Sequence, residues 1–245
     1  MPTKTRIDRL LVEQGLAESR EKAQAMILAG EVLANEQKVD KPGREVASDS
    51  AIRLVGQPGK FVSRGGLKLE GALDHFGVDV TGKTALDIGS SAGGFSDCLL
   101  QRGAQKIYAI DVGTNQLHWK IRKDPRVIVR EQVNARHLTE EDVPEFCGFF
   151  CCDVSFISAT LILPAVAPLI TDSGEGVVLA KPQFEVGKGQ VGKGGIVREP
   201  ELHRASVDRV AEALVAAGFP QVDSMDSPIL GAEGNREFLL HARRS

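Results

Sequence analysis

Glycines and carboxylates between residues 87 and 111 form a pattern that suits a nucleoside-bearing cofactor. Gly89 follows a short apolar segment, and the pair Gly93–Gly94 precedes a segment with helical spacing. Glycine in a strand-to-helix turn lets the backbone approach a ligand closely, and an acid about twenty residues later, here Asp111, can accept hydrogen bonds from ribose hydroxyls. The residues predicted to contact the cofactor are Asp87, Gly89, Ser90, Ser91, Gly93, Gly94, Phe95, Asp111, Val112 and Asn134.

The order of the glycines separates two kinds of cofactor. The loop reads Gly-x-x-x-Gly-Gly, whereas dinucleotide-binding folds carry Gly-x-Gly-x-x-Gly. Asp87 stands just before the loop, and a carboxylate at that place suits a cationic cofactor better than a pyrophosphate. We therefore predict S-adenosylmethionine, with a nicotinamide dinucleotide as the second choice. The alternative interpretation is a tight turn without a ligand, and Asn134 could likewise be a turn residue instead of an adenine contact.

A second glycine-rich segment has the spacing of a phosphate-binding loop but lacks its metal ligand. In Gly187-x-x-x-x-Gly192-Lys193, the next residue is Gly194, where a Ser or Thr would bind Mg²⁺. The segment also does not lead into a helix. We interpret it as a cationic loop, whose Lys188 and Lys193 could close over bound RNA.

Hydrophobic periodicity divides the chain into two domains. Residues 1–58 are expected to form two short helices, the second with Ser19 as its N-cap, followed by short strands around a turn at Asn35-Glu36. Residues 59–62 are a linker, because glycine and proline are frequent just before them. Residues 63–245 alternate strands and helices. This predicts a Rossmann-like α/β domain with a doubly wound, mostly parallel sheet after a small α+β domain.

Short apolar runs and helical spacing define the expected elements of the second domain. Expected strands cover residues 84–88, 106–110, 127–130, 149–153, 176–180, 222–224 and 238–240. Expected helices cover residues 94–102, 158–170 and 201–217. In such a sheet the turns that follow parallel strands meet at one edge, so the glycine loop and Asp111 are expected to lie together.

The composition fits a folded protein with local, not global, positive charge. The 245 residues are 42% hydrophobic and 26% charged, and the formal net charge is −3. A nucleic-acid surface therefore requires clustered Lys and Arg. The most apolar stretch, residues 161–170, contains Pro164 and Pro168 and is shorter than the roughly 20 residues that span a bilayer. No signal peptide is recognisable, so a cytoplasmic location without membrane contact is expected.

Five motifs occur in an order that resembles one family of RNA methyltransferases. They are residues 63–69 (SRGGLKL), 86–95 (LDIGSSAGGF), 152–158 (CDVSFIS), 181–185 (KPQFE) and 234–238 (GNREF). Together they resemble the TlyA, or hemolysin A, family. The second domain is similar to the FtsJ-like ribose 2′-O-methyltransferases, and residues 4–56 are similar to the S4 RNA-binding domain. Two positions depart from these patterns, since Glu36 replaces a usual glycine and Ala92 a usual proline.

The resemblance implies a S-adenosylmethionine-dependent enzyme that methylates ribose 2′-hydroxyls of rRNA, with cytidine targets in ribosomal subunits. It carries the family's catalytic tetrad over to Lys68, Asp153, Lys181 and Glu237. Asp153 and Lys181 each end an expected strand, at the edge where open α/β sheets assemble their sites. A lysine is mostly protonated at neutral pH. Lys181 therefore acts as a base only if burial or Lys68 favours its neutral form, and otherwise stabilises the developing oxyanion as a cation.

RNA contacts are expected from clustered basic residues, which bind phosphates and position the RNA without reading its sequence. These residues are Arg6, Arg9, Arg20, Lys22, Arg64, Lys120, Arg122, Lys188 and Lys193. The alternative interpretation of each cluster is a solvated charged face.

Two other functions compete with a methyltransferase. A noncatalytic RNA-binding or ribosome-assembly protein would not need the intact tetrad, and a pore-forming hemolysin would need a membrane-length apolar segment. Methylation of a base is disfavoured, because the chain lacks an Asn-Pro-Pro-Tyr or Asp-Pro-Pro-Tyr segment and a Pro-Cys pair. Cys147, Cys151 and Cys152 lack partners at zinc-like spacing, so burial in the core without a metal is expected.

Overall fold

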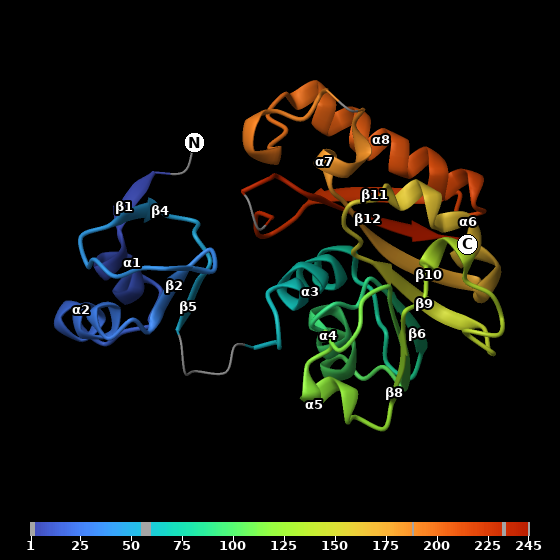
Figure 1. The fold of residues 1–245 in the computed structure, drawn as a ribbon, viewed down its shortest axis with the longest axis horizontal. Helices are drawn as coiled ribbons and strands as arrows, with labels where there is room; N and C mark the ends of the chain where they lie inside the picture. Colours follow the sequence, from blue (N-terminus) through green and yellow to red (C-terminus); the bar gives the residue numbers. More distant parts are fainter. Residues whose placement is uncertain (1–2, 55–59, 188, 232–233, 245) are drawn as a thin grey trace. The chain divides into compact units, whose positions relative to one another are not determined.

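The computed structural model describes residues 3–54, 60–187, 189–231 and 234–244, which belong to two compact units, Met1–Lys60 and Phe61–Ser245 (Figure 1). Each unit has a hydrophobic core of its own. The described part contains no helix that combines the length and the apolar character needed to cross a membrane.

The first unit is a small α+β structure. Its elements are β1 (Lys4–Arg6), α1 (Ile7–Glu13), α2 (Arg20–Leu28), β2 (Val32–Ala34), β3 (Gln37–Lys38), β4 (Glu45–Ala47) and β5 (Ile52–Leu54). Strands β3, β2 and β5 form an antiparallel sheet, while β1 pairs with β4. The Ser19 hydroxyl accepts a hydrogen bond from the Lys22 backbone N–H at 3.2 Å, which confirms the predicted N-cap of α2. The predicted turn at Asn35-Glu36 joins β2 to β3, and both residues have positive φ.

The second unit contains a seven-stranded sheet in the order β11, β12, β10, β9, β6, β7, β8. The strands are β6 (Thr84–Ile88), β7 (Lys106–Asp111), β8 (Val127–Glu131), β9 (Cys147–Cys152), β10 (Ile170–Ala180), β11 (Gln221–Asp226) and β12 (Phe238–Arg243). Strands β6 to β10 pair in parallel, and β12 runs antiparallel to both of its neighbours. The chain moves outward from β6 through β7 and β8, then returns to β9 on the other side of β6. The carboxyl ends of β6 and β9 thus form the topological switch point, where open α/β sheets bind ligands.

Helices cover both faces of this sheet (Figure 1). On one face, α3 (Gly65–Phe76) and α4 (Gly94–Gln101) supply residues such as Leu69 and Leu99 to one core. On the other face, α8 (Pro200–Ala216) supplies Val210 and Leu214 to a second core. Three further short helices come after strands in the chain, namely α5 (Trp119–Arg122), η1 (Ala135–His137) and α7 (Pro182–Glu185), and η4 (Lys193–Gly195) follows α7. The predicted doubly wound, mostly parallel fold is therefore confirmed.

The prediction of a single helix over residues 158–170 is wrong. The segment folds as η2 (Ala159–Leu161), α6 (Leu163–Val166) and η3 (Ala167–Leu169), and β10 begins at Ile170. Pro164 and Pro168 explain the interruptions, because proline has no backbone N–H and its ring clashes with the preceding turn.

Helix α3 was absent from the prediction, although it carries Lys68. Three of its residues are glycines, which are poor helix formers, so its propensity signal is weak. Its buried residues Leu69, Ala72 and Leu73 pack against the sheet. The helix is therefore stabilised by tertiary packing more than by its local sequence.

Candidate active site

The loop between β6 and α4, residues 89–93, is shaped by its glycines. Gly89 has a φ of 80° and Gly93 a φ of 91°, both in the left-handed region that favours glycine. A Cβ at Gly89 would collide with the backbone carbonyl of Asp153, the residue that follows β9. The loop thus packs directly on the backbone that carries Asp153, and two adjoining cavities open there, both lined by Gly89, Ser91, Asp153 and Ser155.

The larger cavity has a volume of about 490 Å³, which is typical of sites for small molecules. Asp111, Val112 and Asn134, three of the residues predicted to contact the cofactor, are among its lining residues. The Asp111 carboxylate accepts hydrogen bonds from the backbone N–H groups of Ser91 and Gly113, both at 2.7 Å. Each carboxylate oxygen has a second lone pair, so Asp111 can still accept hydrogen bonds from ribose hydroxyls.

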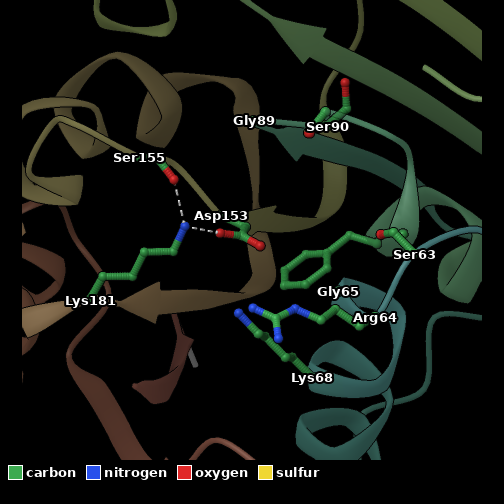
Figure 2. A pocket seen from close by; sticks show the side chains of 12 residues that line it. Ser63, Arg64, Gly65, Lys68, Gly89, Ser90, Asp153, Ser155 and Lys181 are labelled. Carbon is green, nitrogen blue, oxygen red and sulfur yellow. Dashed lines mark hydrogen bonds and ion pairs between the residues drawn. The ribbon is translucent and has the colours of Figure 1, made fainter. Parts of the chain in front are cut away.

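The smaller cavity, of about 210 Å³, brings charged side chains together from three segments (Figure 2). Lys181 follows β10; its Nζ lies 2.6 Å from Asp153 Oδ1 and donates to Ser155 Oγ at 2.9 Å. Apart from this ion pair, the buried Asp153 Oδ1 atom accepts no hydrogen bond from the described residues. Lys68 of α3 and Arg64, the N-cap of that helix, line the same cavity (Figure 2).

Lys68 also belongs to a buried ion pair. Its Nζ lies 2.5 Å from Glu237 Oε2, and the two side chains are 7% and 3% exposed. Glu237 immediately precedes β12, so the pair joins the start of that strand to α3. The four tetrad residues therefore form two ion pairs. Lys68, Asp153 and Lys181 line the smaller cavity, while Glu237 contacts it through Lys68.

The other predicted cofactor residues divide between the two cavities. Ser90, Gly94 and Phe95 line the smaller cavity. Asn134 lines the larger one, and its side-chain oxygen also accepts a hydrogen bond from the Arg136 backbone N–H at 3.1 Å. Asn134 is thus both a cavity residue and the N-cap of η1. Gly93 lines neither cavity and instead begins α4 as its left-handed N-cap.

The structure places the Asp87 side chain away from both cavities. Successive side chains of a strand point to opposite faces, and Asp87 points to the face covered by α4. There it is fully buried and accepts hydrogen bonds from Ser96 Oγ at 2.5 Å and from Cys151 Sγ at 3.5 Å. Burial raises the pKa of Asp87 to about 6. Asp87 therefore lines neither cavity, and its side chain joins β6 to α4 beside the glycine loop.

The sequence prediction missed several residues of the cavities, among them Ser155 and Phe156. Ser155 lines both cavities and holds Lys181, and Phe156 lines the larger one with 93% of its surface exposed. Phe156 also has a φ of 66°, which is unusual for a bulky residue. Both lie in the 152–158 motif, so the motif itself was the available signal.

The cysteines lie in the core, as predicted. Cys98, Cys147, Cys151 and Cys152 are all buried. Burial raises the pKa of the Cys147 thiol to about 12 and that of Cys151 well above its usual value. Both raised pKa values favour the neutral thiol, which fits a packing role in the core.

Two of the predicted RNA-binding arginines are held by one buried carboxylate. Asp8 Oδ2 accepts hydrogen bonds from Arg6 at 2.9 Å, Arg20 at 3.0 Å and Gln24 at 3.0 Å. The hydrogen bonds, that of Arg6 above all, hold the pKa of Asp8 well below its usual range. The Arg6 and Arg20 side chains nevertheless remain 48% and 55% exposed. Their outer N–H groups are thus fixed in direction and open to solvent.

The other predicted RNA-binding residues differ in their surroundings. Arg9 pairs with Glu13 across one helical turn at 3.1 Å, and Lys22 is exposed at the start of α2. Lys120 lies 3.5 Å from Asp97, and Arg122 forms an ion pair with Glu131. Two residues belong to the loop after α7: Lys193 is exposed in η4, and Lys188 lies outside the described residues.

Comparison with known proteins agrees with this architecture. The FtsJ-like methyltransferase model matches residues 61–244, and the S4 domain model matches residues 5–52. The chain is 43% identical over 244 residues to the 16S/23S rRNA (cytidine-2′-O)-methyltransferase TlyA of Mycobacterium tuberculosis, covering 99% of this chain and 91% of TlyA. It is 50% identical over 242 residues to YqxC of Bacillus subtilis, provisionally named an rRNA methyltransferase, covering 97% and 85%. A solved structure from Streptococcus thermophilus, provisionally named a hemolysin, has 45% identity and a TM-score of 0.75, covering 100% and 90%.

The sheet order, the glycine loop and the cavities beside it define an S-adenosylmethionine-dependent methyltransferase. Within that class, the chain belongs to the TlyA/hemolysin A family, in which an S4 domain precedes an FtsJ-like methyltransferase domain.

The buried Asp87 carboxyl predicts a specific pH dependence of stability. Because its pKa is raised to about 6 in the folded protein, its contribution to stability is complete below its unfolded pKa and is lost as the pH rises through 6. About two pKa units correspond to roughly 3 kcal/mol. We expect this part of the pH dependence to be absent from Asp87→Asn, measured by urea unfolding between pH 4 and pH 7.5. Asp172→Asn, at an exposed carboxyl, should leave the dependence unchanged; identical curves for wild type and Asp87→Asn would contradict the assignment.

Proposed function

We propose that this protein transfers a methyl group from S-adenosylmethionine to the ribose 2′-hydroxyl of cytidines in rRNA, acting on ribosomal subunits in the cytoplasm. The observation that carries the proposal is the convergence of Lys68, Asp153 and Lys181 on one small cavity beside the glycine loop. The relative TlyA, whose name specifies cytidine-2′-O methylation of 16S and 23S rRNA, supports the choice of acceptor.

The two cavities fit the two ends of the cofactor. The larger cavity offers Asp111 to the ribose hydroxyls, with Val112 and Asn134 beside the adenine. The unsubstituted Gly89 leaves backbone exposed where the cavities meet, and the buried Asp153 Oδ1 atom has no hydrogen-bond partner among the described residues apart from its ion pair with Lys181. When bound, S-adenosylmethionine supplies an electrophilic methyl group on a positively charged sulfur.

Lys181 is oriented for an acceptor oxygen by its two neighbours. An ammonium group has three N–H donors, and Lys181 directs one toward Asp153 and one to Ser155. The third is left for the ribose oxygen in the smaller cavity. Because Lys181 contacts a carboxylate and a hydroxyl oxygen, we assign it to stabilising the developing oxyanion, with the hydroxyl proton passing to solvent.

Arg64 and Lys68 supply positive charge on the opposite wall of this cavity (Figure 2). Glu237 fixes the Lys68 ammonium in a buried ion pair. Arg64 forms no side-chain hydrogen bond or ion pair with the described residues, so its guanidinium is free to bind a phosphate of the acceptor nucleotide. These contacts hold the ribose in a single orientation, which accounts for much of the rate enhancement in a reaction between two bound molecules.

Phe156 offers an exposed aromatic face at the edge of the larger cavity, three residues from Asp153. Proteins that act on RNA hold unstacked bases against such rings. We assign Phe156 to holding the target cytosine while its ribose lies against Lys181.

The first unit binds RNA in this proposal. Arg6 and Arg20 are held in direction by Asp8, and Arg9 and Lys22 are exposed cations on the two helices. Such residues bind phosphates and position the RNA without reading its sequence. On the methyltransferase unit, Lys120, Arg122 and Lys193 are further candidates for phosphate contacts.

The role of Lys181 is tested by its replacement. Lys181→Ala should lower kcat for transfer of labelled methyl groups to undermodified ribosomal subunits by about 100-fold or more, because it removes the donor to the oxyanion. S-adenosylmethionine affinity, measured by calorimetry, should remain close to that of wild type. Lys83→Ala is the matched control, since Lys83 pairs with Glu175 and lines neither cavity. Normal activity in Lys181→Ala would remove this residue from the mechanism, whereas a wild-type protein without methyl transfer would favour a noncatalytic RNA-binding protein.

The RNA-binding role of the first unit predicts a change in salt dependence. The double variant Arg9→Ala/Lys22→Ala should bind rRNA more weakly, and the slope of log affinity against log salt should decrease by about 2, one for each lost phosphate contact. Cofactor affinity should not change. Lys106→Ala, which removes a cation paired with Glu145 at the start of β7, is the control. An unchanged salt slope in the double variant would contradict the assignment of these two residues.

A further inference from the structure

Glu185 is a buried carboxylate near the proposed site with no role in the mechanism given above. It ends α7, is 3% exposed and directs both oxygens at one neighbouring segment. Oε2 accepts a hydrogen bond from Ser158 Oγ at 2.5 Å, and Oε1 accepts one from the Ala159 backbone N–H at 2.8 Å. The carboxylate therefore joins the end of the 181–185 motif to the end of the 152–158 motif.

The two segments joined by Glu185 are those that carry the proposed catalytic residues. Residues 153–158 follow β9 and residues 181–185 follow β10, and these strands are parallel neighbours. Near the sheet the segments are joined by Lys181, which contacts Asp153 and Ser155. At their far ends they are joined by Glu185. The 153–158 loop is thus fixed at both ends to the segment that begins with Lys181.

The loop needs such support because its backbone is strained. Phe156 has a φ of 66°, in a region that costs a non-glycine residue free energy and persists only where surrounding structure enforces it. Its ring is 93% exposed, so burial of the side chain does not enforce this conformation. The contacts that remain are the Phe184 ring, 5.3 Å from that of Phe156, and the anchored ends of the loop.

Glu185 is itself held by the helix layer. Arg209 of α8 donates a hydrogen bond to the Glu185 backbone carbonyl at 2.5 Å. Helix α8 is fixed by Val210 and Leu214 in the core on that face of the sheet. The position of the carboxylate is therefore set by the rigid part of the fold and not by the loop that it binds.

We propose that Glu185 is a positioning residue for methyl transfer: by binding Ser158 and Ala159 it holds the 153–158 loop so that Asp153 and Ser155 orient Lys181. This inference rests on the proposed function for its effect on rate. We call the two hydrogen bonds from Ser158 and Ala159 to Glu185 the clamp. Their effect on the mobility of the 153–158 loop can be measured without methyl transfer.

The experiment compares Glu185→Ala, Glu185→Gln and Glu175→Ala in the full chain. Glu175 is the matched control, because it lies on β10, has two side-chain partners, Lys83 and His241, and lines neither cavity. We expect Glu185→Ala to lower kcat at saturating substrates by about 10-fold to 100-fold, as for a small displacement of reacting groups. Glu185→Gln should recover most of this loss, because the amide oxygen can still accept from Ala159 and the Ser158 hydroxyl can accept from the amide N–H. Glu175→Ala should lower the Tm with kcat unchanged.

Chymotrypsin cleavage after Phe156 provides the readout that does not depend on activity. Loosening of the loop in Glu185→Ala should speed this cleavage by about 10-fold, since proteolysis follows the population of locally opened states. Glu175→Ala should be cleaved like wild type. If Glu185→Ala is poorly folded, Ser158→Ala, which removes the hydroxyl that donates to Glu185 and caps η2, should show smaller changes of the same kind.

The outcomes separate the two proposals. Glu185→Ala with the cleavage rate and kcat of wild type would overturn the clamp. The clamp would also be overturned if Glu175→Ala lost kcat to the extent that its Tm is lowered, because the loss in Glu185→Ala would then reflect stability alone. A wild-type protein that transfers no methyl group to rRNA would overturn the proposed function. Faster cleavage in Glu185→Ala would still establish the clamp in that case, and wild-type cleavage would still refute it.

Discussion

The proposed site depends on one structural constraint, the parallel pairing of β9 with β10. In this register Cys152 lies opposite Val178, so both strands end at the same edge of the sheet and Asp153 meets Lys181 there. The glycine loop after β6 packs on the backbone of Asp153 because Gly89 carries no side chain. A shift of either strand would separate the ion pair from the loop. The catalytic arrangement is therefore a property of the sheet edge more than of any single motif.

Buried charges around this edge serve orientation at the expense of stability. Lys68 with Glu237, and Lys181 with Asp153, are pairs that water reaches poorly, and such pairs rarely stabilise a fold more than apolar residues would. Their directional contacts do fix where each ammonium points. This agrees with a reaction in which the protein contributes alignment and electrostatic stabilisation, while the reactive group comes from the cofactor.

The sequence predicted those features that are encoded locally. Short apolar runs gave the strands of the second unit, and the glycine loop gave the position of the cofactor site at the switch point. Helical spacing over residues 158–170 was misleading, because the prolines within it break the helix. Contacts between different elements were not predictable. Asp87 on β6 accepts a hydrogen bond from Ser96 on α4, and Lys181 reaches Ser155 because the sheet places the ends of β9 and β10 side by side. The tetrad was assigned by family resemblance, and its two ion pairs required the fold.

The central claim is that the methyl group goes to a ribose oxygen held by Lys181. The most direct test supplies labelled S-adenosylmethionine and undermodified ribosomal subunits to the wild-type protein, then locates the label by nucleoside mass spectrometry and alkaline cleavage of the rRNA. The account predicts labelled 2′-O-methylcytidine, with the phosphodiester bond on its 3′ side resistant to alkali. A label on the base, next to a bond that alkali still cleaves, would contradict it.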